Sequence, residues 1–131
     1  MKKNNEWELN SHKDLVVWQK SIEFVAKIYE TTNNFPKEEL FGLTSQLRRA
    51  AISIPSNIAE GFARKHNKEL IQFLYVSLGS SVEIETQLLI AKNINYINEE
   101  IYVMLTNLLS EISKMLIGLI HKLESNKKSK N

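Results

Sequence analysis

The chain has 131 residues, of which 43% are hydrophobic, 24% are charged and none is cysteine. This length suits one domain that buries about two-thirds of its unfolded surface, and four glycines with two prolines are too few for a turn-rich all-β fold. The lack of cysteine excludes disulfides, zinc–thiolate centres and thiol nucleophiles, whereas a net charge of +2 excludes little by itself.

Residues 1–12 carry charge but no apolar run, so we expect a flexible leader and no secretory signal. No apolar window reaches the length of about 20 residues that a membrane span needs. A cytoplasmic protein without membrane contact is therefore expected. A first helix should begin at Lys13 or Asp14, with Ser11 or Asp14 as N-cap, and stop before Thr32.

The apolar seam of this first helix should step by three and four residues, through Leu15, Trp18, Ile22, Val25 and Tyr29. Pro36 disfavours helical angles at the residue before it. We expect Phe35 to fold back onto the helices.

A second helix is expected to begin within residues 37–43 and to run to Phe62. Pro55 removes the hydrogen bond to the Ala51 carbonyl, at a cost of about 3 kcal/mol. Apolar residues nevertheless stay on one side across the proline, which favours one kinked helix. This apolar side comprises Leu47, Ala50, Ala51, Ile54, Ile58 and Phe62, and the polar side comprises Gln46, Arg49, Ser53, Ser56, Asn57 and Glu60. We assign an architectural role to Pro55, Asn57, Glu60 and Gly61.

A third helix should start after Asn67 as N-cap, with Glu69 in its first turn, and reach about Lys92. Its core side is expected to contain Ile71, Leu74, Leu78, Val82, Leu88 and Leu89, with Phe73 and Val76 beside them. Small residues in its middle would let another helix come close; they are Ser77, Gly79, Ser80 and Ser81.

A fourth helix should run from Glu99 to about Glu124. Its seam contains Ile101, Leu105, Leu108, Ile112, Met115 and Leu119, widened by Leu109, Leu116, Ile120 and Leu123. Four amphipathic helices with short links predict an all-α fold, an antiparallel up-down-up-down four-helix bundle over residues 13–124, followed by a basic flexible tail at 125–131. Because Val17, Phe24 and Ile28 make the apolar faces wider than one neighbour covers, we also expect a homo-oligomer.

No catalytic constellation is present. The three histidines lack a partner at helical spacing, and no Glu-x-x-His pair, nucleophile elbow or Gly-rich phosphate loop occurs. We therefore expect no enzyme, cofactor, metal or small-molecule substrate. Glu83 and Glu85 are expected to pair with an arginine of the second helix rather than to catalyse.

Basic residues concentrate between Gly42 and Lys68, where five cations face one carboxylate, a net charge of +4. Such a cluster can attract polyanions. Arg48 and Arg49 project about 100° apart on a helix, so one could be an internal or intersubunit ion-pair partner and the other a phosphate contact. The candidate nucleic-acid-binding residues are Arg48, Arg49, Arg64, Lys65 and Lys68, assisted by Lys127, Lys128 and Lys130.

Three runs of the sequence carry a family resemblance: DLVVWQKSIEFVAKIYETTNNFPKEE, GLTSQLRRAAISIPSNIAEGFAR and FLYVSLGSSVEIETQLLIAK. Over residues 14–120 the chain closely resembles the four helix bundle proteins encoded in 23S rRNA intervening sequences. The most specific segments are residues 46–49, 53–61 and 79–88. The chain departs from the family at His66-Asn67, where a Ser or Thr cap is common, and at Ala63, where glycine is more usual.

The resemblance implies a left-turning four-helix bundle that assembles as a homopentameric ring. It also implies a fold similar to that of the accessory protein of diversity-generating retroelements, a basic pentamer that works with a reverse transcriptase and binds nucleic acid. Our first hypothesis is a non-enzymatic scaffold that binds structured RNA or DNA. The alternative is a protein-interaction adaptor for a reverse transcriptase or a ribosome-associated partner.

Overall fold

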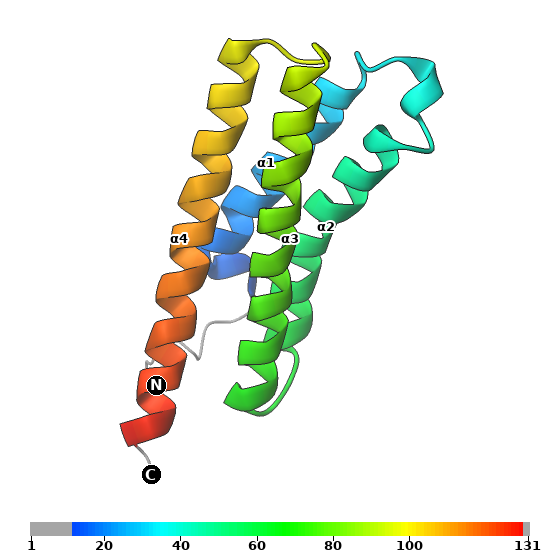
Figure 1. The fold of residues 1–131 in the computed structure, drawn as a ribbon. Helices are drawn as coiled ribbons and strands as arrows, with labels where there is room; N and C mark the ends of the chain where they lie inside the picture. Colours follow the sequence, from blue (N-terminus) through cyan, green and yellow to red (C-terminus); the bar gives the residue numbers. More distant parts are fainter. Residues whose placement is uncertain (1–11, 130–131) are drawn as a thin grey trace.

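The computed structural model describes residues 12–129, and the side chains of residues 12–126, as an all-α protein (Figure 1). Its helices are α1 (Val16–Thr32), α2 (Leu43–Phe62), α3 (Asn67–Asn93) and α4 (Glu99–Ser129), with short 3₁₀ helices at His12–Asp14 and Lys37–Glu39. Apart from His12, the predicted leader lies outside the described residues, as do residues 130 and 131 of the predicted tail. The all-α prediction is confirmed.

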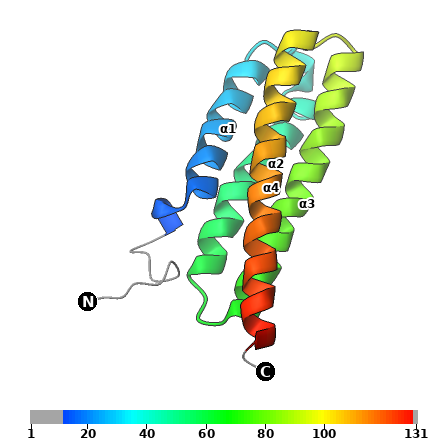
Figure 2. The same ribbon diagram turned by 90° about the vertical axis from the view of Figure 1, so that its left-hand side faces the viewer.

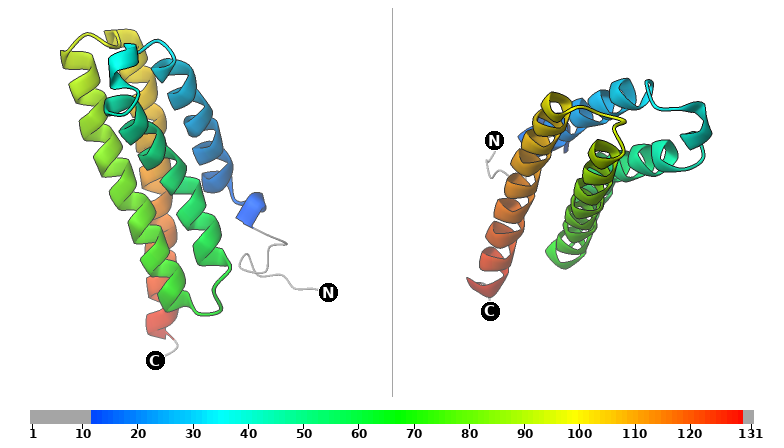
Figure 3. Two further views of the ribbon diagram at one scale, coloured as in Figure 1. Left: turned by 90° about the vertical axis from the view of Figure 1, so that its right-hand side faces the viewer. Right: turned by 45° about the horizontal axis from the view of Figure 1, so that its top comes forward.

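Each helix packs against two others, in the cyclic order α1, α2, α3, α4. Figure 2 shows α4 in front of α2 with α1 and α3 on either side, and the left view of Figure 3 shows α2 in front from the opposite direction. The α1–α2 and α3–α4 connections lie at one end of the bundle, and the α2–α3 connection lies at the other (Figure 1). The α1–α2 pair and the α3–α4 pair therefore form opposite faces.

The apolar face predicted for α2 is confirmed. Leu47, Ala50, Ala51, Ile54 and Ile58 are buried, and Phe62 packs against them while half-buried. The helix continues through the buried Pro55, as its apolar pattern indicated. The angle of a kink at this proline stays a prediction.

The faces predicted for the other helices were wrong in part, because their apolar arcs are wide enough to fit two orientations. In α1, Ile22 and Tyr29 are exposed, and Phe24 and Ile28 are fully buried. In α3, Val76, Val82 and Leu89 face outward. The buried positions of α3 include Ser77, Ser80, Ser81, Ile84 and Ala91, and those of α4 are Leu105, Leu109, Ile112, Leu116, Ile120 and Leu123.

Three helix boundaries also differ from the prediction. Leu15 occupies the N-cap of α1 and Asp14 lies in the preceding 3₁₀ helix, while Ser11 is outside the described residues. His66, not Asn67, is the N-cap of α3, and neither cap residue makes a side-chain cap bond. The fourth helix runs to Ser129, past the predicted end at Glu124, because polar and basic residues at an exposed helix end can continue its hydrogen bonding.

α4 also corrects the expectation about membrane spans. Within Glu99–Asn126 it has an apolar stretch long enough to cross a membrane by length and composition, with a mean hydropathy of 1.5. One side of this helix, from Leu105 to Leu123, lies in the protein core. A core helix passes the same test, so the finding does not by itself assign α4 to a membrane.

Serine side chains join α2, α3 and α4. Ser53 Oγ lies 2.8 Å from Ser80 Oγ, and Ser77 Oγ donates to the Ile54 carbonyl at 2.9 Å. On the other side of α3, Ser113 of α4 donates to Ser81 at 3.0 Å. Small α3 residues therefore meet neighbouring helices as predicted, except for Gly79, which has open space around it. We call this set the serine seam: Ser53, Ser77, Ser80, Ser81 and Ser113.

Glu39 ties together the two connections at one end of the bundle. Its Oε1 accepts a hydrogen bond from the Leu43 backbone N–H at 3.0 Å, and its Oε2 accepts one from the Tyr96 hydroxyl at 2.9 Å. Phe35, buried as predicted, lies with its ring 5.1 Å from that of Tyr96. The bond from Leu43, and next the bond from Tyr96, lower the pKa of Glu39 below its ordinary value of 4.5.

This shift predicts a pH-dependent contribution to stability. Because the carboxylate has a lower pKa in the folded state, its contribution is present above the unfolded pKa and is lost as pH falls through the folded pKa. Glu39→Gln should therefore lower the melting temperature at neutral pH, and the difference from the parent should vanish in acid. Thermal unfolding across acidic and neutral pH checks this, with Glu30→Gln on α1 as an exposed control. A difference that persists undiminished in acid would contradict the assignment.

Candidate nucleic-acid interface

The five predicted nucleic-acid-binding residues lie in two places rather than one. Arg48 and Arg49 are in the first half of α2, whereas Arg64, Lys65 and Lys68 are at the α2–α3 connection. Fifteen residues separate Arg49 from Arg64, about 22 Å along the helix direction at 1.5 Å per residue. One protomer therefore does not bring all five side chains to a single patch.

Arg48 is engaged by the end of α1. Its Nε donates to Thr32 Oγ1 at 2.9 Å, and its Nη2 donates to Asn33 Oδ1 at 3.1 Å. The guanidinium also lies 4.4 Å from the ring centroid of Tyr29. These contacts occupy several of the guanidinium N–H donors with which arginine would bind a phosphate. Arg48 thus joins α1 to α2, a role that the sequence had left open.

Arg49 is exposed, and no described residue pairs with it. The ion pair expected between an α2 arginine and Glu83 or Glu85 is absent among the residues that the structure describes, and Glu83 instead accepts a bond from Gln87 at 3.2 Å. Arg49 borders an open groove between α1 and α2. Tyr29, Leu40 and Ile52 supply the exposed apolar side chains of that groove.

The second group, at the α2–α3 connection, contains one paired and two free cations. Arg64 forms a 2.6 Å ion pair with Glu60 one turn earlier, and its guanidinium lies 5.1 Å from the Phe73 ring centroid. Lys65 and Lys68 are exposed and have no described partner. We call Arg64, Lys65 and Lys68 the basic end.

Two residues of the predicted architectural motif shape α2 near the basic end. Gly61 is buried, and a Cβ added there would lie 2.9 Å from both Leu70 Cδ1 and Phe73 Cβ. Asn57 donates to the Ser53 carbonyl at 2.8 Å and to its hydroxyl at 3.0 Å. The glycine at position 61 thus lets the first turns of α3, which carry Lys68, pack closely against the end of α2.

The end of α4 lies at the same end of the bundle as the α2–α3 connection (Figure 1). Tyr75 of α3 donates to Glu124 of α4 at 3.3 Å, and the negative charge of Glu124 raises the pKa of Tyr75. The last turn of α4 carries Lys127 and Lys128. The carboxylates of Glu60 and Glu69 offset part of the positive charge of Arg64, Lys65 and Lys68.

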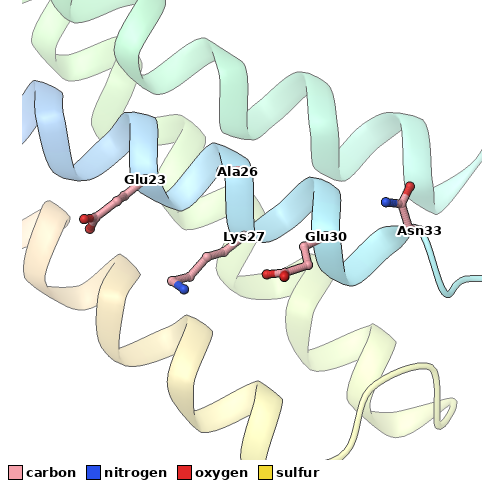
Figure 4. Close-up of a pocket in the computed structure, with 5 residues that line it drawn as sticks. All are labelled: Glu23, Ala26, Lys27, Glu30 and Asn33. Carbon is pink, nitrogen blue, oxygen red and sulfur yellow. The ribbon is translucent and has the colours of Figure 1, made fainter.

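Another surface depression carries no comparable arrangement. Its lining comes entirely from α1 and the residue after it, and Figure 4 shows Glu23, Lys27 and Glu30 on one side of that helix. Charges of both signs one turn apart are typical of a solvated helix face. Within residues 12–129, no three His, Asp or Glu side chains are grouped so as to hold a metal.

Comparison with known proteins gives a family and a structural neighbour. The model of a family described as 23S rRNA-intervening sequence protein matches residues 13–118. The fold is similar to the crystal structure of a protein with unknown function from the S23 ribosomal protein family of Bacteroides thetaiotaomicron, with 31% identity and a TM-score of 0.73. That similarity covers 80% of this chain and 98% of the other. No curated protein matches.

Proposed function

Because the chain belongs to the 23S rRNA-intervening sequence protein family, we propose that it is a non-enzymatic homo-oligomer that binds RNA or DNA through its basic end. The family description suggests rRNA-like nucleic acid, and the resemblance implies a pentamer. We place this activity in the cytoplasm, where the exposed cations would meet folded RNA.

The observation that supports the proposal most is the state of Lys65 and Lys68. Both ammonium groups are exposed and without a described partner, beside Arg64 at the α2–α3 connection. Ammonium groups without a partner in the protein can neutralise phosphates, and this releases the counterions condensed on the nucleic acid. In a homo-oligomer the basic end is repeated once per subunit, so a modest charge on one protomer becomes a multivalent surface. Binding should depend strongly on salt and weakly on sequence.

We predict that Lys65→Gln with Lys68→Gln weakens binding to a 23S rRNA fragment. The plot of log affinity against log salt should become less steep, by about one unit for each phosphate that a bound protomer no longer neutralises. Fluorescence anisotropy with a labelled fragment, at about 50 and about 200 mM salt, measures both effects. Lys37→Gln with Lys114→Gln is the matched control, since it removes the same charge from exposed sites elsewhere. Absent binding at low salt, or equal losses in the two double variants, would refute the proposal.

Phe41 favours the second candidate, a protein-interaction adaptor. Its side chain is 92% exposed beside Leu40, which is 50% exposed, in the α1–α2 connection at the other end of the bundle (Figure 1), and adjoining exposed apolar side chains suit a protein contact. Lys65→Glu with Lys68→Glu separates the two functions. Nucleic-acid binding should be lost, whereas docking of a reverse transcriptase or ribosome-associated protein at Phe41 should survive.

A further inference from the structure

One side of the bundle presents a basic and apolar groove between α1 and α2. It has a volume of about 390 Å³ and contains Arg49. The guanidinium of Arg49 has no partner among the described residues, while neighbouring Arg48 is held by α1. Apolar side chains that remain 37–50% exposed surround it: Tyr29, Leu40 and Ile52. We call this surface the α1–α2 groove.

The opposite side of the bundle presents an acidic and apolar groove between α3 and α4, with a volume of about 290 Å³. Val82 and Ile117 in its walls are 58% and 41% exposed, although both are large and aliphatic. Glu85 borders the groove and makes no ion pair with any residue that the structure describes. We call this surface the α3–α4 groove.

Two residues of each groove, Ile52 with Arg49 and Val82 with Glu85, lie at about the same level of the bundle. Ser53 contacts Ser80, and Ser77 bonds to Ile54, so residue numbers rise along α2 as they fall along the facing part of α3. Ile52 and Val82 are within two residues of the Ser53–Ser80 contact. Arg49 lies four residues before Ser53 and Glu85 five after Ser80, which places both about 6–8 Å from the contact toward the same end.

We propose that the α1–α2 groove of one copy docks onto the α3–α4 groove of a second copy, with Ile52 against Val82 and Arg49 paired with Glu85. This inference rests on the proposed self-association and names its surfaces. Burial of exposed Ile52 and Val82 would drive the contact. An arginine–carboxylate pair, which can be bidentate, would set its alignment.

The charges of Arg49 and Glu85 also favour a contact between two different surfaces over a contact between two identical ones. Two α1–α2 grooves would bring Arg49 against Arg49, and two α3–α4 grooves would bring Glu85 against Glu85, so self-complementary pairing is disfavoured. Because the complementary surfaces differ and lie on opposite faces at one level, each copy can contact one neighbour on each side. Such a heterologous contact forms a ring when its rotation closes.

A charge exchange tests the ion pair. Arg49→Glu and Glu85→Arg should each raise the dissociation constant of the oligomer about tenfold or more, and the double variant should restore assembly. Sedimentation velocity over a protomer dilution series measures this, and circular dichroism verifies that each variant is folded. Single variants that assemble like the parent, or a double variant no better than the singles, would overturn the assignment.

Cross-linking tests the apolar contact independently, because the chain contains no cysteine. When Ile52→Cys and Val82→Cys proteins are mixed, a short bis-maleimide should join one to the other, while each variant alone should give little dimer. Val16→Cys, another exposed valine, mixed with Val82→Cys is the control. An oligomer that shows no Ile52–Val82 cross-link would refute the named surfaces but leave self-association intact. A protein that is monomeric at all concentrations would refute both, and nucleic-acid binding would then be judged separately.

Discussion

Phe24→Ala is expected to lower the free energy of unfolding by about 3–5 kcal/mol, whereas Ile22→Ala, two residues earlier, should cost less than about 1 kcal/mol. Phe24 is fully buried, so its truncation loses apolar burial and leaves a cavity. Ile22 is 43% exposed and loses far less. Urea unfolding followed by circular dichroism gives both values.

The comparison must be made at one protomer concentration, because the apparent stability of an oligomer depends on it. The result also distinguishes the two orientations of α1, since the sequence pattern had placed Ile22 in the seam and Phe24 outside it. Equal losses at the two positions, or a larger loss at Ile22, would contradict the orientation in which α1 buries Phe24.

Gly61→Val should destabilise the protein by about 1–3 kcal/mol through overpacking. The first carbon of the new side chain would already lie 2.9 Å from Leu70 Cδ1 and from Phe73 Cβ. The Leu70 methyl could shift, but Phe73 Cβ is attached directly to the α3 backbone. Relief would therefore require α3 to move away from the end of α2, and the basic end would move with it. Differential scanning calorimetry and anisotropy on one preparation would record both changes.

Gly118→Val is the matched control, because a Cβ at Gly118 of α4 would point into open space beyond its own helix. This substitution should leave stability within about 0.5 kcal/mol of the parent, since valine and glycine differ little in helix propensity at an exposed site. If both valines had the same effect, close approach at Gly61 would not be the reason for its glycine.

The sequence predicted the buried face of α2 correctly and the buried faces of the other helices only in part. The α2 face was identified because its apolar and polar residues separate cleanly, with small alanines among the former. In α1, α3 and α4 the apolar arc is wider than the buried arc, and the pattern placed Ile22 and Val82 in the core, whereas Phe24 and Ile84 are the buried positions. Only the placement of neighbouring helices decides between them. Some of the apolar side chains that stay exposed on these helices line the two proposed docking grooves.

The sequence pointed to individual candidate residues, but it did not predict that they lie in two separate places on the protomer. Sequence proximity of Arg48 and Arg49 to Arg64 suggested one basic cluster, yet Arg49 and Arg64 lie about 22 Å apart along the direction of α2. The engagement of Arg48 by Thr32 and Asn33 could not be foreseen, since it depends on where the end of α1 meets α2. Lys65 and Lys68 follow the last apolar residue of α2, which is consistent with their exposure in the structure.

The serine seam has a consequence for how uniquely the bundle is aligned. Aliphatic faces can pack at several axial offsets that differ by one helical turn, because leucine and isoleucine interlock with little directional preference. In the observed alignment, the Ser53 hydroxyl meets that of Ser80 and the Ser113 hydroxyl meets that of Ser81. An offset that separated these partly buried hydroxyls would cost about 1–3 kcal/mol for each group left unpaired. The seam therefore fixes the axial register of α2 and α4 against α3, and so holds Arg49 and Glu85 level on opposite faces.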